Sequence, residues 1–300
     1  MQKITDILAQ KDRTFSFEIF PPRHSNDLEA LFGTVAALAE TVSDWVSVTY
    51  GAGGSTSVNS KSTRGIINQI HHRLGLTCMH HLTLVGQTRD ELAAIVAQVK
   101  DDGIRNLLAL RGDPPPEMGG RFRKIEGGLE FCYELVDLIR EIGGDYFSIG
   151  VAGFPEGHPQ CPSKELDTEY LKSKVDHGAE FVITQFFFEN EVYSEYLERT
   201  ARAGVNVRII PGVLPVMDYD KLVRFAERCG AYICDLVHET FAPLRGDREM
   251  TARAGAEYAA RQCEDLVRRG APGIHFYSLN QVEPVRTVAR QVMDGGGTRA

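Results

Sequence analysis

Short apolar runs alternate with longer helix-like stretches from one end of this chain to the other, and no other feature limits the fold as strongly. The runs have the length and composition of β-strands. We expect eight strands, at Thr14–Phe20, Trp45–Tyr50, Thr77–Leu84, Asn106–Arg111, Tyr146–Ala152, Phe181–Phe187, Val207–Ile210 and Gly273–Tyr277. We expect helices at Asp27–Thr41, Val58–Arg73, Arg89–Asp101, Leu129–Ile142, Glu165–His177, Glu191–Ala203, Tyr219–Glu227, Glu249–Arg269 and about Val282–Met293.

This alternation predicts a parallel sheet with right-handed crossovers. Eight such units fit an α/β chain folded as a (β/α)₈ TIM barrel. A doubly wound open sheet is the competing architecture, but no Gly-x-Gly-x-x-Gly follows the first strand, which weakens it. No linker-like stretch divides the chain, so we expect a single domain over residues 1–300, with the last few residues disordered.

Composition excludes several function classes. A net charge of −8 argues against nucleic-acid binding, which needs a basic face. No apolar run approaches the roughly 20 residues of a membrane-spanning helix, and the first residues lack a signal-peptide core. The six cysteines show no Cys-x-x-Cys spacing, so we expect reduced thiols in a cytoplasmic protein. Cys78, His80 and His81 lie close together, but no carboxylate completes a ligand set, and we expect no metal site.

Glu18 is the most informative single residue. It lies in Phe15-Ser-Phe-Glu-Ile-Phe-Pro-Pro-Arg23, where large apolar residues alternate with other residues and two prolines end the strand. A carboxylate buried among such neighbours would be costly if charged, so it would keep a raised pKa and hold a proton at neutral pH. That is the state a general acid needs. A salt-bridged glutamate on an edge strand, paired with Arg23, is the alternative.

Polar or glycine- and proline-rich segments follow all eight expected strands. In a (β/α)₈ barrel the carboxyl ends of the strands form the active site, so these segments predict its position. They are Glu18, Thr49–Ser55, His80–His81, Arg111–Asp113, Phe154–Pro159, Thr184–Phe188, Pro211–Tyr219 and His275–Asn280.

Each segment also has an ordinary structural explanation. The glycines at 51–54 could form a simple turn or, before a helix, an anion-binding loop. His81 could be a satisfied core histidine, and Arg111 with Asp113 an ion pair. Asp167, Lys172 and Lys174 could form a solvated helix face. Gln185 is harder to explain, because a buried amide needs partners that a ligand could supply.

Eight of these motifs, taken in order, resemble methylenetetrahydrofolate reductases of the bacterial, single-domain type. They are Phe17–Arg23, Val48–Ala52, His81–Thr83, Leu110–Asp113, Phe154–Pro159, Ile183–Phe188, Ile210–Pro215 and His275–Asn280. The resemblance covers about residues 10–290. It implies a (β/α)₈ barrel that holds non-covalent FAD and reduces 5,10-methylenetetrahydrofolate to 5-methyltetrahydrofolate. The electrons come from NADH or NADPH by a ping-pong reaction that serves one-carbon metabolism and methionine synthesis.

The resemblance also assigns roles to individual residues. Glu18 matches the general acid, Asp113 the aspartate between flavin and folate, and Gln185 a glutamine shared by folate and nicotinamide. Tyr219 matches an aromatic residue that stacks on the substrate. The implied flavin contacts are Thr49, Tyr50, Ala52, His81, Arg111, Gly112, Asp113, Phe131, Cys132, Phe154, His158, Asp167, Tyr170, Ser173 and Lys174; Thr49 would also touch the nicotinamide.

Three positions depart from the family pattern. Gln281 stands where an arginine usually helps to hold folate, so that another cation, such as Arg286, would have to serve or affinity would fall. Phe154 replaces a common tyrosine, and Ser173 replaces a basic residue, which leaves Lys174 as the main cation near the flavin diphosphate.

The sequence leaves some questions open. No fingerprint of a 2′-phosphate site is present, which favours NADH over NADPH, and the family implies a homo-oligomer. Two alternatives remain: another small-substrate flavin or aldol-type barrel enzyme, and a non-catalytic homologue that binds flavin or folate as a subunit of a complex.

Overall fold

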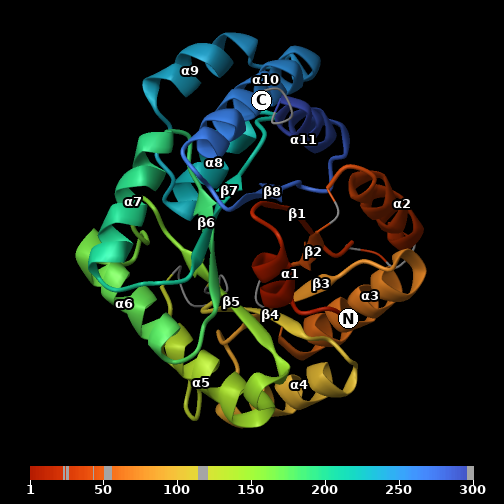
Figure 1. Cartoon of the computed structure of the whole chain (residues 1–300), viewed down its shortest axis with the longest axis vertical. Coiled ribbons are helices and arrows are strands. Elements are labelled where there is room, and N and C mark those ends of the chain that lie inside the picture. The colour runs from red at the N-terminus through yellow and green to blue at the C-terminus, as the bar shows by residue number, and fades with distance from the viewer. Residues whose placement is uncertain (23, 25–26, 43, 51–55, 114–120, 296–300) are drawn as a thin grey trace.

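Eight parallel strands close into a barrel in chain order, with β8 pairing back onto β1 (Figure 1). The computed structural model describes residues 1–22, 24, 27–42, 44–50, 56–113 and 121–295. The strands are β1 Thr14–Ile19, β2 Trp45–Val48, β3 Cys78–Thr83, β4 Asn106–Leu110, β5 Ser148–Gly153, β6 Phe181–Phe186, β7 Arg208–Val213 and β8 Gly273–Tyr277. The predicted (β/α)₈ barrel is confirmed, and all eight predicted strands are present.

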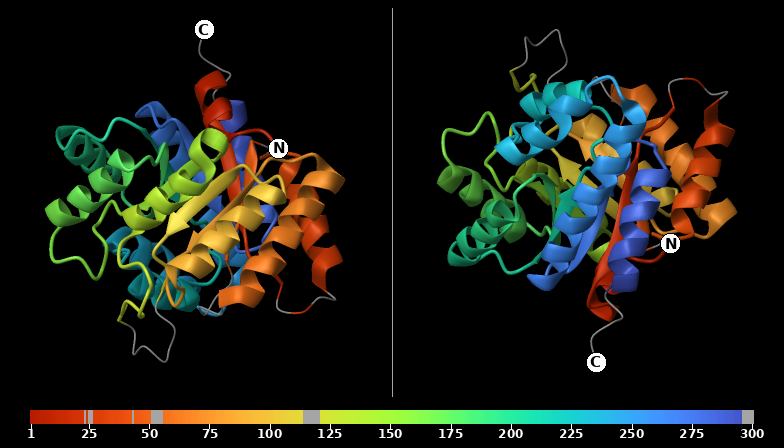
Figure 2. Two further views of the ribbon diagram at one scale, coloured as in Figure 1. Left: turned by 90° about the horizontal axis from the view of Figure 1, so that it is seen from below. Right: turned by 90° about the horizontal axis from the view of Figure 1, so that it is seen from above.

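Most of the helices surround the barrel on its outside (Figure 2), and α1 covers one end of it. They are α1 Ile4–Gln10, α2 Leu28–Ala39, α3 Thr56–Leu74, α4 Arg89–Asp101, α5 Cys132–Gly143, α6 Lys164–Asp176, α7 Asn190–Arg202, α8 Tyr219–Cys229, α9 Asp235–Phe241, α10 Arg248–Arg268 and α11 Glu283–Gly295, with 3₁₀ turns η3 Gly144–Tyr146 and η4 Ala242–Leu244. The sequence did not predict α1 and α9. Both have seven residues, too few for a helical period to stand out.

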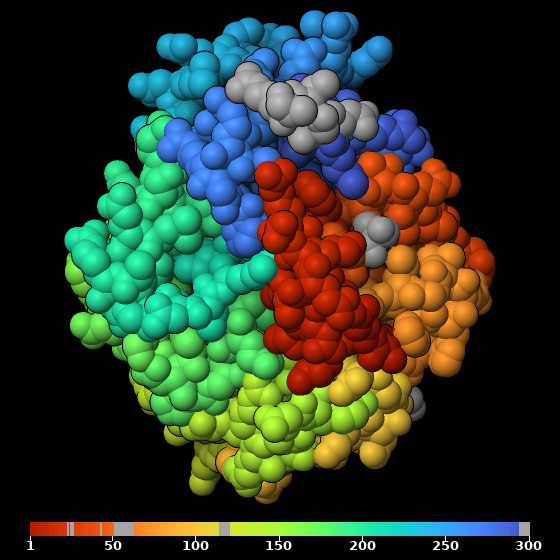
Figure 3. All heavy atoms as spheres, viewed as in Figure 1, coloured from red at the N-terminus to blue at the C-terminus, as the bar shows by residue number. Residues whose placement is uncertain are grey.

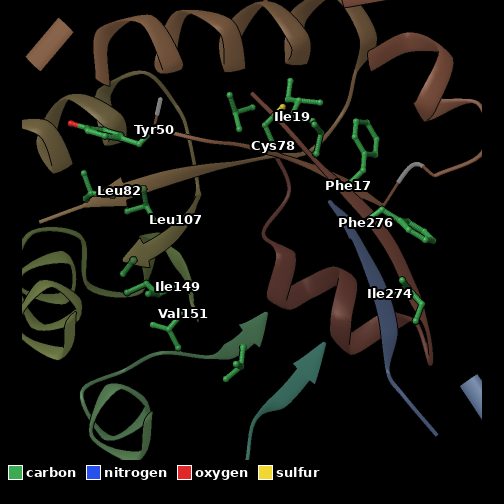
Figure 4. Packing of buried hydrophobic residues seen from close by; sticks show 14 of the residues in the cluster. Phe17, Ile19, Tyr50, Cys78, Leu82, Leu107, Ile149, Val151, Ile274 and Phe276 are labelled. Carbon is green, nitrogen blue, oxygen red and sulfur yellow. The ribbon is translucent and has the colours of Figure 1, made fainter. Parts of the chain in front are cut away.

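The main hydrophobic core lies between the barrel and its helices. On β1 the side chains of Phe17 and Ile19 point outward into this layer and are fully buried, and Phe276 on β8 does the same (Figure 4). Burial of each such side chain contributes about 1.5–3 kcal/mol. Since side chains alternate along a strand, the outward direction of Phe17 and Ile19 places Ser16 and Glu18 on the inner face of the barrel.

Helix α1 closes the amino-terminal end of the barrel. Its residues Ile4, Ile7 and Leu8 are buried in a cluster inside the barrel. The other members of that cluster come from the strands: Trp45, Met79, Leu108, Phe181, Ile183 and Ile210. Asn106 fixes the helix, because its Oδ1 accepts from the Ile4 N–H at 2.7 Å and its Nδ2 donates to Gln2 O at 3.0 Å. In the space-filling view these first residues cover the centre of the face shown (Figure 3).

A second hydrophobic cluster lies between the ends of β6 and β7 and the helices α8–α10. Phe186 and Phe188 belong to it, whereas Phe187, which points the other way, belongs to the main core. All three phenylalanines of this run are therefore buried, on alternating sides of the strand. Gln185 precedes the run, at a register shift between β6 and β7, and its side chain is only partly buried.

Candidate active site

Glu18 lies on the inner face at the carboxyl end of β1, paired with Ser47 on β2 and Tyr277 on β8. Only 7% of the residue is exposed. Burial raises the pKa of its carboxyl group from 4.5 to about 8, so the group holds a proton at neutral pH. The predicted buried acid is therefore present. The edge-strand alternative is wrong, because β1 has a neighbour on each side; its proposed partner Arg23 lies outside the described residues.

Two buried histidines lie in the barrel beside this carboxyl group. The Nε2 atom of His81 is 3.5 Å from Glu18 Oε2 and 2.5 Å from Ser47 Oγ. Nδ1 of His275 is 2.8 Å from Ser16 Oγ. Burial lowers the pKa of each imidazole to about 3, and for His81 the charge of a protonated His275 would add to the effect. The short Glu18–His81 distance therefore joins two neutral groups at pH 7, and it is not an ion pair.

The ring of Tyr277 helps to bury this part of the site. Its hydroxyl group donates to Thr184 O at 2.8 Å, so the side chain crosses β7 to reach β6. Gly212 on β7 makes this crossing possible. A Cβ atom there would lie 2.5 Å from the tyrosine ring and 2.3 Å from Thr184 O. A residue with a side chain at 212 would displace Tyr277 and open a path for water toward Glu18.

The Arg111-Gly-Asp113 segment follows β4 and lies at the same end of the barrel. Gly112 has a φ of +86°, and a Cβ there would lie 2.7 Å from a Val85 methyl group, so the turn requires glycine. It leaves the Asp113 side chain exposed. Arg111 Nη2 donates to Gln160 Oε1 at 2.6 Å and lies 3.3 Å from His158 Nε2.

Cys229, at the end of α8, connects the two carboxyl groups in space. Burial raises the pKa of its thiol to about 12, and the charges of Asp113 and Glu18 add to that effect. The charge of Arg228 opposes them. Glu18 lies near the carboxyl end of β1 and Asp113 follows β4, so both belong to the same mouth of the barrel. Sequence reasoning treated Cys229 as an ordinary thiol, and no local pattern marks it.

Cationic and aromatic side chains from the loops after β4 and β5 and from the helices α5 and α6 lie beside this mouth of the barrel. We call this group of side chains the β5–α6 wall. Lys174 Nζ donates to Ala152 O at 2.7 Å. Burial, followed by the charges of Arg111 and Lys174, lowers the pKa of His158 to about 4. Burial raises the pKa of Asp167, and Lys174 partly offsets this. Asp167 and Lys174 therefore lie inside the wall, and the alternative of a solvated helix face is wrong for these two.

The aromatic members of this wall are arranged as a stack. The ring centroids of Phe131 and Tyr170 are 5.4 Å apart, with planes 23° from parallel. Next to them Cys132 Sγ donates to Ala109 O at 3.2 Å. The rings of Phe154 and His158 meet edge-on, with 4.7 Å between their centroids. Ser173 is partly buried on α6, the helix that also carries Tyr170.

A buried hydroxyl group near β2 has no partner. Thr49 Oγ1 is inaccessible to solvent and has no hydrogen-bond partner among the residues that the structure describes. Such an atom is costly to bury unless a ligand or water satisfies it. Tyr50 follows Thr49 in the chain, and the centroid of its ring is 5.9 Å from that of His80. Ala52 and the rest of the glycine-rich segment lie outside the described residues.

Gln185, Tyr219 and Gln281 are three of the expected substrate contacts, and each has different surroundings. Gln185 lies with Phe154 and Cys229 around a crevice that is too narrow to hold a water molecule. Tyr219 is buried, with its hydroxyl group 2.6 Å from His238 Nδ1 and Arg245 over its ring, beside a cavity of about 270 Å³. Gln281 is exposed after β8. Their roles in substrate binding stay predictions.

Among the described residues, no group of three histidine, cysteine, aspartate or glutamate side chains could hold a metal ion. None of the helices in the described part of the chain has the length and hydrophobicity that a membrane span needs.

A closed parallel barrel with a protonated carboxyl group at the carboxyl ends of its strands defines a (β/α)₈-barrel enzyme built around a buried acid. The chain belongs to the methylenetetrahydrofolate reductase family, whose model matches residues 3–293. It is 39% identical over 268 residues to 5,10-methylenetetrahydrofolate reductase of Salmonella typhimurium, which covers 89% of this chain and 86% of that protein.

A longer relative and a solved structure extend this comparison. Methylenetetrahydrofolate reductase (NADH) 1 of Arabidopsis thaliana is 32% identical over 93% of this chain, which spans about half (48%) of that protein's length. A solved structure of an uncharacterized Clostridium thermocellum protein that binds two copies of 5-methyl-5,6,7,8-tetrahydrofolic acid matches 96% of this chain and 98% of its own, with a TM-score of 0.64. At 13% identity this likeness shows the fold alone.

Proposed function

We propose that this protein reduces 5,10-methylenetetrahydrofolate to 5-methyltetrahydrofolate with electrons from NADH, through bound FAD, in a ping-pong reaction. The observation that carries this proposal is the protonated carboxyl group of Glu18 at the mouth of the barrel. Membership of the reductase family supports the choice of substrate. Relatives are named for NADH and for NADPH, so the choice of NADH rests on the lack of a 2′-phosphate fingerprint in the sequence. We further propose that the chain acts as a single-domain homo-oligomer in the cytoplasm.

The residues of the β5–α6 wall and β2 fit FAD. The unpartnered hydroxyl group of Thr49 suits a polar atom of the cofactor. The half-buried guanidinium of Arg111 and the ammonium of Lys174 suit its diphosphate, which needs cations away from water. The stacked rings of Phe131 and Tyr170 suit a flat aromatic group. When bound, FAD would take a hydride from the nicotinamide and pass it to the one-carbon unit.

Glu18 performs the acid step. Its O–H donates a proton to N10 of the folate, the bond from N10 to the one-carbon unit breaks, and the imidazolidine ring opens to an iminium on N5. The added hydride then gives the 5-methyl product. A carboxyl group whose pKa is about 8 is both protonated at pH 7 and acidic enough to transfer the proton. Because the imidazole of His81 is neutral at pH 7, it places no positive charge beside Glu18 that would favour the carboxylate and lower its pKa.

Other side chains bind and orient the substrate. The exposed carboxylate of Asp113 faces the open end of the barrel, where it accepts hydrogen bonds from the folate ring. Gln185, whose side chain lies beside Phe154 and Cys229, donates to folate or to the nicotinamide amide in turn. Such shared use fits a ping-pong reaction, in which the two substrates occupy one site at different times.

The test separates the two half-reactions in the variant Glu18→Gln. The amide is nearly isosteric but cannot act as an acid, so the variant should keep FAD and accept electrons from NADH at the normal rate. Its reduction of methylenetetrahydrofolate should fall by about 10²-fold or more. Stopped-flow absorbance of the flavin measures both steps. Glu141→Gln, on the exposed surface of α5, is the matched control. Normal folate reduction by Glu18→Gln would remove Glu18 from this role.

A further inference from the structure

The turn that follows β8 has an unusual backbone. Leu279 and Asn280 have φ values of +49° and +59°, and they are the two non-glycine residues with positive φ in the described part of the chain. Such conformations cost on the order of 1 kcal/mol each and persist only where the surroundings hold them. Asparagine adopts this region more readily than most residues, whereas leucine does not. Something in the structure therefore fixes this turn.

The contacts of Ser278 and Asn280 explain it. Asn280 Oδ1 accepts from the Phe20 N–H at 2.9 Å, and its Nδ2 donates to Phe20 O at 3.0 Å. The hydroxyl group of Ser278 donates to Glu18 O and accepts from the Asn280 N–H at 3.2 Å. The regular β1–β8 ladder ends at the pair Glu18–Tyr277. Beyond that pair the Asn280 side chain takes the place of a neighbouring strand.

The end of β1 has few other supports. On its other side the Thr49 N–H donates to Ile19 O at 3.1 Å. After Phe20 the chain continues with Pro21 and Pro22, which have no backbone N–H to donate. Without the Asn280 side chain, both backbone groups of Phe20 would lose their partner, and the segment that carries Glu18 would be fixed mainly from the β2 side.

We propose that Asn280 is a positioning residue for the acid Glu18, acting through Phe20. The proposal rests on the proposed function of Glu18. Holding the end of β1 against β8 aims the carboxyl group at the substrate and keeps it away from water. Gln281 is the next residue in the same turn, and its N–H donates to Ser278 O at 2.8 Å. A substrate that contacts position 281 therefore bears on the turn that positions the acid.

The variant Asn280→Gly tests this proposal, because glycine accepts the positive φ and removes only the two side-chain hydrogen bonds. Leu279→Gly is the matched control: it makes the same change one residue earlier, at an exposed side chain. Asn280→Asp keeps the acceptor for the Phe20 N–H but loses the donor to Phe20 O. We expect Asn280→Gly to slow folate reduction about 10- to 100-fold, because small misplacements of reacting groups have effects of that size. Asn280→Asp should slow folate reduction by a factor between those of wild type and Asn280→Gly. The rate of flavin reduction by NADH should stay within twofold of wild type in all three variants.

A second readout reports the carboxyl group without any turnover. The stability of the ligand-free protein between pH 6.5 and 9, taken relative to the same protein carrying Glu18→Gln so that the other titrating groups cancel, follows the titration of Glu18. The titratable groups that face Glu18 are His81 from β3, Tyr277 from β8 and Cys229 from α8. His81 titrates below this window, and Tyr277 and Cys229 titrate above it. Looser packing in Asn280→Gly should admit water and lower the midpoint of this titration by about one pH unit, while Leu279→Gly leaves it unchanged.

The outcomes distinguish a failure of the positioning role of Asn280 from a failure of the proposed function of Glu18. If Asn280→Gly lowers thermal stability but leaves both the midpoint and the folate half-reaction as in Leu279→Gly, Asn280 is only a structural residue and the positioning role is wrong. Slowing of both half-reactions to the same degree would also overturn it. If Glu18→Gln itself reduces folate normally, the proposed function fails; the pH midpoint of Asn280→Gly then still decides whether Asn280 controls the surroundings of Glu18.

Discussion

The substitution Glu18→Gln should change how the stability of the protein depends on pH. Burial raises the pKa of Glu18 from 4.5 in the unfolded chain to about 8 in the folded protein. Between these two values the folded state holds a proton that the unfolded state releases. The free energy of unfolding therefore falls as pH rises through this window, by about 1.4 kcal/mol per pH unit, and levels off above the folded pKa.

The difference between wild type and Glu18→Gln from pH 6.5 to 8 isolates this effect. The two buried histidines, His81 and His275, have folded pKa values of about 3, below their ordinary 6.5. Their unfolded forms still bind some protons near pH 6.5, which lowers stability at the acid end of the window, but both histidines are present in wild type and variant, so their effect cancels in the difference. Allowing for partial titration near pH 8, wild type should lose about 1.5 kcal/mol between pH 6.5 and 8 through Glu18. The Glu18→Gln variant has no proton to release at this position, so it should lose none of this 1.5 kcal/mol or so of unfolding free energy.

Urea denaturation at several pH values, with both proteins free of ligand, measures the difference. The free energies of unfolding of wild type and Glu18→Gln should diverge in favour of the variant as pH rises, by the same 1.5 kcal/mol or so. Glu141→Gln, an exposed site, should run parallel to wild type. Parallel curves for wild type and Glu18→Gln would mean that the carboxyl group is ionised in the folded protein, which would refute both its burial and its role as an acid.

Three further predictions follow from the site and the barrel. Asp113→Asn should slow folate reduction and raise the flavin midpoint potential, because it removes a negative charge near the ring; a redox titration that shows an unchanged or lower potential would place Asp113 away from the flavin. Gln281→Arg should lower the KM for methylenetetrahydrofolate several-fold, from a gain of about 1 kcal/mol for a charge-assisted hydrogen bond, whereas Arg286→Ala should not change it, since Arg286 is engaged by two glutamates. Steady-state kinetics with no twofold change for Gln281→Arg would mean that residue 281 does not contact folate. Asn106→Ala should cost about 2–4 kcal/mol in urea denaturation, because it strands the Ile4 N–H and other buried groups; a loss under 1 kcal/mol would mean that α1 is held by its apolar contacts alone.

Local patterns in the sequence were enough to predict the barrel and the acid. The strands are visible because parallel strands buried on both faces form dense apolar runs. Glu18 could be predicted as a buried acid because it alternates with Phe17 and Ile19 near the end of the first strand, which two prolines terminate. The missed helix α1 has three buried apolar residues, but in seven residues they do not separate from a chance grouping.

Local sequence patterns could not predict contacts between distant parts of the chain. The pairs His81–Ser47 and His275–Ser16 depend on the register between strands, and no local pattern encodes register. The approach of Cys229 to both carboxyl groups depends on how α8 packs over the mouth of the barrel. The sequence motifs therefore predict which strand ends carry polar side chains, whereas the partners of each side chain are seen only in the closed structure.

The bonds between the turn after β8 and the end of β1 join residues 260 positions apart in the chain. The surroundings that raise the pKa of Glu18 are therefore complete only when the last strand has docked beside the first. The protonation state of this carboxyl group should then report barrel closure, and a chain that ends before residue 278 should leave Glu18 hydrated, with an ordinary pKa.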